Sequence, residues 1–232
     1  MDGTATQTRP AVSPVVVLAV AMFGIAWAAP LVRLSSAPPL VIATWRLVVA
    51  LAFLGGALLA RREWGAWRSL DRRAHALAAA AGTMLALHFW SWNASLGFTS
   101  VAASVVLVNL QPAIVAAGSA LLLREAPTRA QVGGMVAAIV GAAIVALPGF
   151  TADGPAGRPP VVGLPAALVG NALAVGGAIT ASGYYLVGRR LRARLDLLPY
   201  VVLVYGWCLV ALLGLAAARG EPRLPWPARD WA

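Results

Sequence analysis

Apolar residues in this chain form long runs, and charged residues lie almost entirely between those runs. A helix that crosses about 30 Å of hydrocarbon needs about 20 apolar residues, and seven runs reach or approach this length. The pattern therefore predicts an all-α fold, a polytopic membrane helical bundle of about seven transmembrane helices. The runs cover residues 14–32, 39–60, 76–96, 101–123, 131–148, 163–187 and 197–216.

Short connections between the runs predict how the helices are joined. Four of the six connections have ten residues or fewer, so most consecutive helices are expected to run antiparallel. The composition agrees with lipid as the solvent, because 60% of the residues are hydrophobic and only 11% are charged, with a mean hydropathy of +0.80. In 232 residues, seven spans leave no room for a separate soluble domain.

The net charge of +10 comes from arginines, and their positions along the chain indicate which loops lie on which side of the membrane. They sit between apolar runs rather than along one face, so we predict no nucleic-acid partner. Positive charge concentrates on the cytoplasmic side of membrane proteins, which predicts a cytoplasmic N-terminus. The expected location is the cell (plasma) membrane, as an inner-membrane protein. Arg46 lies inside a run; the other arginines divide 12 to 5, the larger set being Arg9, Arg61, Arg62, Arg68, Arg72, Arg73, Arg124, Arg129, Arg189, Arg190, Arg192 and Arg194, and the smaller Arg33, Arg158, Arg219, Arg223 and Arg229.

The sequence offers little for a membrane-embedded enzyme. It contains no metal-ligand cluster, no Ser/His/Asp set and no nucleophile with a base at a useful spacing. We therefore predict no enzyme activity, no catalytic residues, no metal and no cofactor. A retinal photoreceptor is excluded because its Schiff base requires a lysine, and the chain has none.

A stretch rich in proline and glycine, residues 148–160, separates the fifth and sixth runs and is typical of a flexible linker. After it, Pro199 opens a run with Tyr205 six residues on, as Pro39 opens one with Trp45 six residues on. This similarity suggests a repeat of five helices. An odd number of spans would place the two copies in opposite orientations, which is common in secondary transporters.

Several short motifs follow one another in a characteristic order. The third run leaves through Leu-Gly-Phe-Thr-Ser (96–100), the fourth opens with small residues, carries Asn-Leu-Gln-Pro (109–112) midway and ends in Arg-Glu (124–125), and the fifth is rich in Gly and Ala. Thr-Trp-Arg (44–46) and Arg-Arg (189–190) agree with the same pattern. In this order of features, the segment 96–147 resembles the EamA domain of the drug/metabolite transporter superfamily.

The resemblance implies a membrane transporter, a carrier of small metabolites or amphipathic compounds that works by alternating access, often for efflux. It divides the chain into a cytoplasmic N-terminal segment (1–13), a first EamA-like five-helix repeat (14–148), an external linker (149–162) and a partial second, inverted repeat of two helices (163–232). The family pattern has ten helices, so helices eight to ten would be missing. A truncated inactive fragment, or a half-carrier that needs a partner, is the alternative; the expected partners are the lipid bilayer and a small-molecule substrate, and a homo-oligomer is left open.

Arg46 is the strongest candidate for binding substrate. Helix direction and a rise of about 1.5 Å per residue place Trp27, Arg46 and Trp90 about 10 Å below the external face. Arg46 would hold an anionic group, with Trp27, Trp45 and Trp90 as walls, because an arginine inside a span usually faces a cavity or a partner. The alternative is an arginine that extends to the external headgroups beside an aromatic belt.

Other polar residues inside the runs are weaker candidates. Asn109 and Gln111 lie near the midplane beside Pro112, where they would bind substrate or form interhelical hydrogen bonds. His88 is a proton carrier or a packing histidine. Asp and Glu are absent from every predicted span, so a proton relay is not supported. Glycines of the fifth run are expected to allow close helix packing: Gly133, Gly134 and Gly141.

Overall fold

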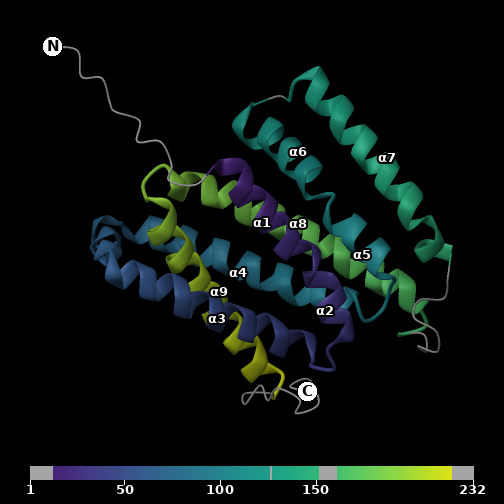
Figure 1. Cartoon of the computed structure of the whole chain (residues 1–232), viewed down its shortest axis with the longest axis horizontal. Coiled ribbons are helices and arrows are strands. Elements are labelled where there is room, and N and C mark those ends of the chain that lie inside the picture. Colours follow the sequence, from purple (N-terminus) through teal and green to yellow (C-terminus); the bar gives the residue numbers. More distant parts are fainter. Residues whose placement is uncertain (1–12, 126, 152–160, 221–232) are drawn as a thin grey trace.

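A computed structural model describes residues 13–125, 127–151 and 161–220, and within these ranges the regular structure is helical apart from one isolated β-bridge, Val161 to Leu164 (Figure 1). The predicted N-terminal segment 1–13 and linker 149–162 lie largely outside the described residues. The helices are α1 (Pro14–Ala26), α2 (Ala28–Leu34), α3 (Pro39–Ala60), the 3-10 helix η1 (Glu63–Ser69), α4 (Arg72–Ser95), α5 (Val101–Val108), α6 (Gln111–Leu123), α7 (Arg129–Thr151), α8 (Ala166–Arg192) and α9 (Leu197–Ala218).

Five segments of the described chain are helical, long and apolar enough to cross a membrane. The all-helical, multi-pass architecture is thereby confirmed. The runs predicted at 76–96 and 131–148 form α4 and α7, but neither helix is among the five, so the number seven and the repeat arrangement stay predictions. The five segments are Val15–Leu34, Pro39–Ala60, Val101–Leu121, Ala166–Arg192 and Leu197–Ala218.

Two of these segments are broken helices. The first is interrupted at Trp27, between α1 and α2, and the other at residues 109–110, between α5 and α6. Each interruption begins three residues before a proline, Pro30 or Pro112. Proline has no N–H for the carbonyl four residues earlier, and its ring crowds that carbonyl, so both breaks follow from the local sequence. The halves α2 and α5 pack against each other.

Helix α4 lies at the centre of the best-packed region, in contact with α3, α8 and α9 (Figure 1). A face of small, fully or almost fully buried residues, Ala74, Ala78 and Ala81, lets the neighbouring helices approach. The second half of α4 is polar for a spanning helix, since it carries His88, Asn93 and two serines. Asn93, Ser91 and Ser95 are buried against neighbouring helices, which lowers the cost of these polar groups in a bilayer.

Glycine is required where α4 meets α9. A Cβ added at Gly82 would lie 2.5 Å from Trp207 Cβ and 2.7 Å from the backbone nitrogen of Cys208. The glycines expected to allow close packing in α7 do not do so, because a Cβ at Gly133, Gly134 or Gly141 meets nothing within 4 Å. That expectation is therefore wrong, and the close approaches lie at glycines of α4, α6 and α8 instead.

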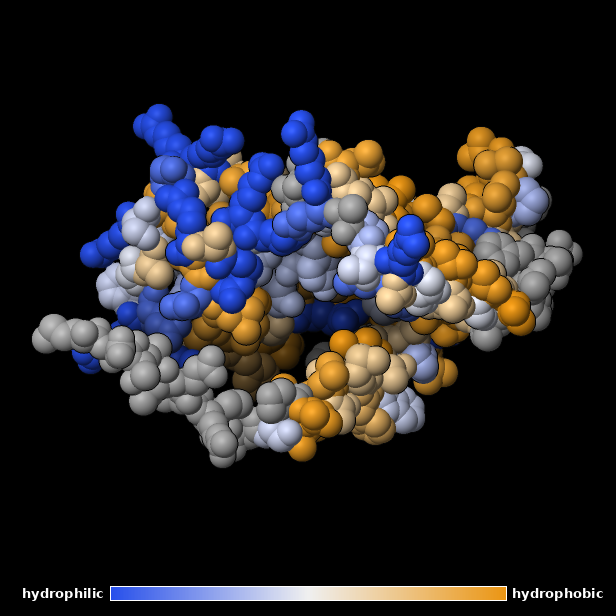
Figure 2. Space-filling model, turned by 90° about the horizontal axis from the view of Figure 1, so that it is seen from above, coloured by the Kyte–Doolittle hydropathy of each residue, from blue (hydrophilic) through white to orange (hydrophobic). Residues whose placement is uncertain are grey.

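The arginines of the described chain gather at one end of the bundle. The ends of α3, α6 and α8 and the starts of α4, α7 and α9 meet there, and Figure 2 shows many hydrophilic residues over this part of the molecule. We call it the arginine-rich end; its members are Arg61, Arg62, Arg68, Arg72, Arg73, Arg124, Arg129, Arg189, Arg190, Arg192 and Arg194. The opposite end carries Arg33 and Arg219 among the described residues.

Candidate functional site

Arg46 of α3 lies over two aromatic rings of α4. Its Cζ is 5.4 Å from the ring centroid of Phe89 and 5.9 Å from that of Trp92, within the range of a cation–π contact. The two helices run antiparallel, and all three residues lie in the half of their helix that is remote from the arginine-rich end. The contact therefore joins residues at similar depth in the bundle.

Two further side chains extend this group. The His88 ring is parallel to that of Trp92, with centroids 6.3 Å apart, and its Nδ1 donates a hydrogen bond to the carbonyl of Gly177 in α8 at 2.9 Å. Tyr205 of α9 lies close enough to interact electrostatically with Arg46. We call Arg46, His88, Phe89, Trp92 and Tyr205 the arginine–aromatic cluster. The bond to Gly177 supports the interpretation of His88 as a packing residue.

The donors of this cluster are only partly satisfied. Among the described residues, no carboxylate forms an ion pair with Arg46, and its side chain remains exposed despite the ring contacts. The buried Nε1 of Trp92 has no hydrogen-bond acceptor in the described part of the chain. A buried donor without a partner is costly, so the cluster combines a positive charge without an ion pair and a buried N–H without an acceptor.

The predicted tryptophans do not surround Arg46 as expected. Trp27 packs edge-to-face on Phe23 of its own segment, with ring centroids 6.2 Å apart, and is 53% exposed. Trp45, next to Arg46 in α3, is also exposed. Trp90 lines a separate cavity. The printed ring contacts of Arg46 are therefore with Phe89 and Trp92, and a role of Trp27, Trp45 and Trp90 in binding stays a prediction.

The cavity beside Trp90 lies between α4 and α8 and has a volume of about 500 Å³. Its wall is apolar except for Ser91 and Thr180, whose hydroxyls donate to carbonyls of their own helices. These hydroxyls have their partners already. The cavity therefore offers shape and apolar surface, with little to fix a polar group.

Asn109 and Gln111 flank the break between α5 and α6. The exposed Asn109 side chain donates from Nδ2 to the carbonyl of Val105 in the preceding turn, at 2.7 Å. The backbone carbonyl of Gln111 accepts from Ser182 Oγ of α8 at 3.3 Å. Asn109 thus stabilises the end of α5, and the link between helices at Gln111 uses its backbone. A role of either side chain in binding stays a prediction.

Sequence reasoning missed three of the aromatic partners, Phe89, Trp92 and Tyr205. The depth argument that selected Trp90 places Phe89 at the same level, one residue away. What the argument lacks is the rotation of the helix, because consecutive residues point about 100° apart. The sequence feature that could have predicted these partners is an arginine in one span together with aromatic residues at the same depth in the next span.

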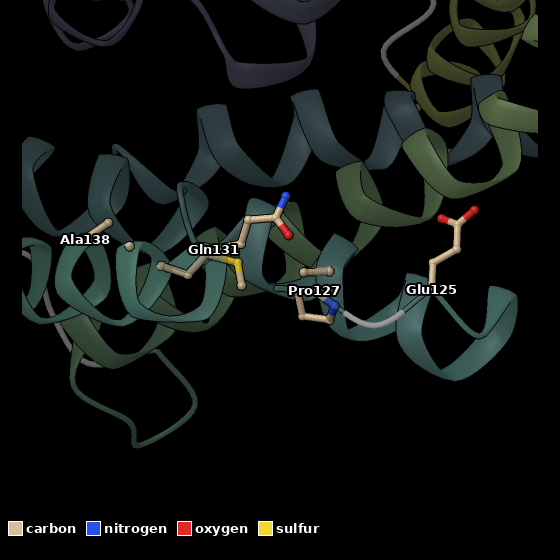
Figure 3. Close-up of a pocket in the computed structure, with 7 residues that line it drawn as sticks. Glu125, Pro127, Gln131 and Ala138 are labelled. Carbon is tan, nitrogen blue, oxygen red and sulfur yellow. The ribbon is translucent and has the colours of Figure 1, made fainter. Parts of the chain in front are cut away.

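A second cavity, of about 590 Å³, lies between α6 and α7 (Figure 3). Small and apolar residues line most of it, together with Gln131 and Glu125. Figure 3 shows Glu125 at one end, apart from Gln131 and Ala138. The carboxylate of Glu125 binds Arg189 of α8 and is therefore not a free charge for a ligand.

Two ion pairs tie the end of α8 to other helices at the arginine-rich end. Arg189 donates to both oxygens of Glu125, at 2.7 and 3.1 Å, and Arg194 Nη1 lies 3.2 Å from Asp71 Oδ1. The hydrogen bonds from Arg189 lower the pKa of Glu125. The backbone N–H of Ala74 lowers the pKa of Asp71, and Arg194 adds to that effect. Both carboxylates are thus held in their charged form.

Fold and sequence together define a multi-pass helical membrane protein. The family model described as the EamA-like transporter family matches residues 13–147, which is more than half of the chain. The chain therefore belongs to the EamA-like transporter family, and the resemblance inferred from the motifs is confirmed. No curated protein and no solved structure gives a significant match.

Proposed function

We propose that this protein is a carrier that moves a small molecule with an anionic group and an apolar part, by alternating access, with the arginine–aromatic cluster as its binding site. The observation that supports this most strongly is Arg46, the eighth residue of a spanning helix, which has aromatic contacts and no ion-pair partner among the described residues. A charge at this depth usually pairs with something, and a substrate anion supplies that partner.

The ring contacts favour this role over an arginine that only reaches for the headgroups. The faces of Phe89 and Trp92 support the apolar part of a ligand while Arg46 binds its anion. The breaks at Trp27 and at residues 109–110 supply two points where helices bend during alternating access. Export, across the cell membrane from a cytoplasmic N-terminal side, is the direction we propose on the family resemblance.

The test is uptake of a panel of small organic anions, aliphatic and aromatic carboxylates, into proteoliposomes. A charge-assisted hydrogen bond contributes about 1.5–3 kcal/mol, so Arg46→Gln is expected to weaken the apparent affinity by about tenfold to about a hundredfold. Arg46→Lys is expected to fall between that variant and the wild type, because it keeps the charge and loses the planar fork.

Arg219→Gln is the matched control, since it removes one charge at the same end of the bundle as Arg46. It is expected to leave uptake unchanged. If Arg46→Gln transports the anions with the wild-type affinity, the arginine–aromatic cluster is not the binding site. If the wild type transports neutral analogues equally well, the proposal that the substrate carries an anionic group is wrong.

A further inference from the structure

The connection between α3 and α4 presents a group of exposed arginines around a fixed 3-10 helix. Five arginines of this connection and of the first turn of α4 are exposed, as is Trp64 of η1. Two acids accompany them, so the segment keeps an excess of positive charge. We call this set the α3–α4 basic surface: Arg61, Arg62, Trp64, Arg68, Arg72 and Arg73.

The position of η1 is fixed from both sides. Arg62 adopts a left-handed conformation, with φ of 56°, which turns the chain directly after the end of α3. On the inner side of η1, Trp67 Nε1 donates a hydrogen bond of 3.0 Å to the carbonyl of Pro199 in α9. The outward-facing residues of η1 are therefore displayed by a held scaffold, not by a free loop.

Two arginines at the end of α8 and just after it are already paired. Arg189 and Arg194 each bind a carboxylate, and Asp71 is further engaged by the backbone of Ala74. Arg61 and Arg72 form no ion pair with any described residue. Their charges are available to an external anion.

The surface lies where a spanning helix leaves the membrane. The segment Pro39–Ala60 ends one residue before Arg61, and η1 begins three residues after Ala60. Arg68 lies over the exposed ring of Trp64, with its Cζ 5.1 Å from the centroid. Tryptophan and arginine together are typical of the headgroup layer, where an apolar ring meets the acyl chains and a cation meets phosphate.

We propose that the α3–α4 basic surface is a binding site for the phosphate headgroups of anionic phospholipids. Guanidinium groups bind phosphate through paired hydrogen bonds, and a basic cluster next to a spanning helix attracts anionic lipid. A zwitterionic lipid is a poorer ligand, because its own cation is repelled by the arginines. The site is separate from the substrate site proposed above, since it lies at the opposite ends of α3 and α4.

The experiment measures lipid retention by the purified full chain in native mass spectrometry, with phosphatidylglycerol and phosphatidylcholine of identical acyl chains. Each arginine of a basic cluster that holds the lipid headgroup contributes a factor of about five in affinity for anionic lipid. Arg61→Gln with Arg68→Gln is therefore expected to reduce the preference for phosphatidylglycerol by about 25-fold. Arg129→Gln with Arg190→Gln, two exposed arginines of the same end, is the matched control and is expected to keep it.

An equal loss in both double variants would overturn the site, because it would show only the total charge of that end. Full displacement of phosphatidylglycerol by inorganic phosphate at equal concentration would also overturn it, since the ligand would then be a free anion. If the double variant does not fold, Arg61→Gln alone must lower the preference about fivefold, as its exposed side chain has no ion pair among the described residues. No change in that single variant would overturn the proposal.

Discussion

The broken segment α1–α2 and helix α8 represent two regions of this bundle that use apolar residues differently. In the first segment 6% of the residues in the spanning window are buried, whereas in α8 the share is 44%, although the first segment is the more hydrophobic of the two. The helix that packs best is thus the one richer in small and polar residues. In a bilayer lipid tails satisfy apolar side chains as well as protein does, so hydropathy does not report which helices form the core.

The same contrast separates the group α3, α4, α8 and α9 from the remaining helices. The buried apolar cluster is drawn from this group, with Leu47, Leu85 and Leu212 among its members. In contrast, most described side chains of α1 and α7 are exposed. Burial rather than hydropathy is therefore expected to decide how much a substitution costs.

The largest difference is expected between two neighbouring leucines of α9. Leu212 is fully buried and Leu213 is 44% exposed. Leu212→Ala leaves a cavity between helices and is expected to lower the free energy of unfolding by about 2–5 kcal/mol, whereas Leu213→Ala costs far less. Unfolding of both variants in mixed micelles with increasing SDS measures the difference. Equal losses would show that the buried cluster is not a packed core.

The close approach of α4 and α9 at Gly82 predicts the next effect. Gly82→Ala places its Cβ against Trp207 and the Cys208 backbone, and such overpacking typically costs about 1–3 kcal/mol. Gly206→Ala is the control, because a Cβ there meets nothing within 4 Å and alanine favours a helix. The midpoint of thermal unfolding in detergent is expected to fall only for Gly82→Ala. A fall of the same size in the control would contradict the packing of these helices.

A smaller effect is expected at the buried contact of Ser95 with Ser104. Their hydroxyl oxygens are 2.6 Å apart and join the end of α4 to α5. Hydrogen bonds between membrane helices contribute about 0.6 kcal/mol on average and at most about 1.7. A double-mutant cycle of Ser95→Ala and Ser104→Ala is expected to give a coupling in this range. Ser69→Ala, which loses an exposed local bond, serves as the control; zero coupling in the cycle would remove this link.

Acidification is expected to have the smallest effect, through the two ion pairs of α8. The pKa values of Asp71 and Glu125 are lowered in the folded protein, so their contribution to stability is complete above the unfolded values near pH 4. It is lost as the pH falls through the lower folded values. When the pH is below about 4, the thermal midpoint of the wild type is expected to decrease. The decrease is expected to be smaller in the double variant Asp71→Asn with Glu125→Gln. Glu63→Gln is the control. An identical acid response in all variants would contradict the pairing.

Hydropathy predicted where helices lie in this chain but not where each one ends. The run 39–60 coincides with α3, and 197–216 differs from α9 by two residues. The run 163–187 stops five residues before the end of α8, because that helix continues through Arg189, Arg190 and Arg192. The end of an apolar run indicates where the chain leaves the hydrocarbon of the bilayer. A helix can extend beyond that point.

The sequence pattern could not predict which residues of neighbouring helices contact each other. Depth follows from helix direction, and the contact of Arg46 with Phe89 lies one residue away from Trp90, which was expected at the level of Arg46. Rotation about the helix axis does not follow, because depth alone does not choose among consecutive residues of α4 that point in different directions. This is why Trp90 was predicted beside Arg46 while Phe89 and Trp92 hold that place.

The polarity of α4 also has a consequence for how the chain enters the membrane. During synthesis this helix leaves the ribosome with α3 as its neighbour, whereas its main contact, α8, follows about 70 residues later. A segment that contains His88, Ser91, Asn93 and Ser95 partitions poorly into lipid by itself. We therefore expect α4 to stay near the insertion machinery as a hairpin with α3, and to reach its final depth only when α8 and α9 arrive.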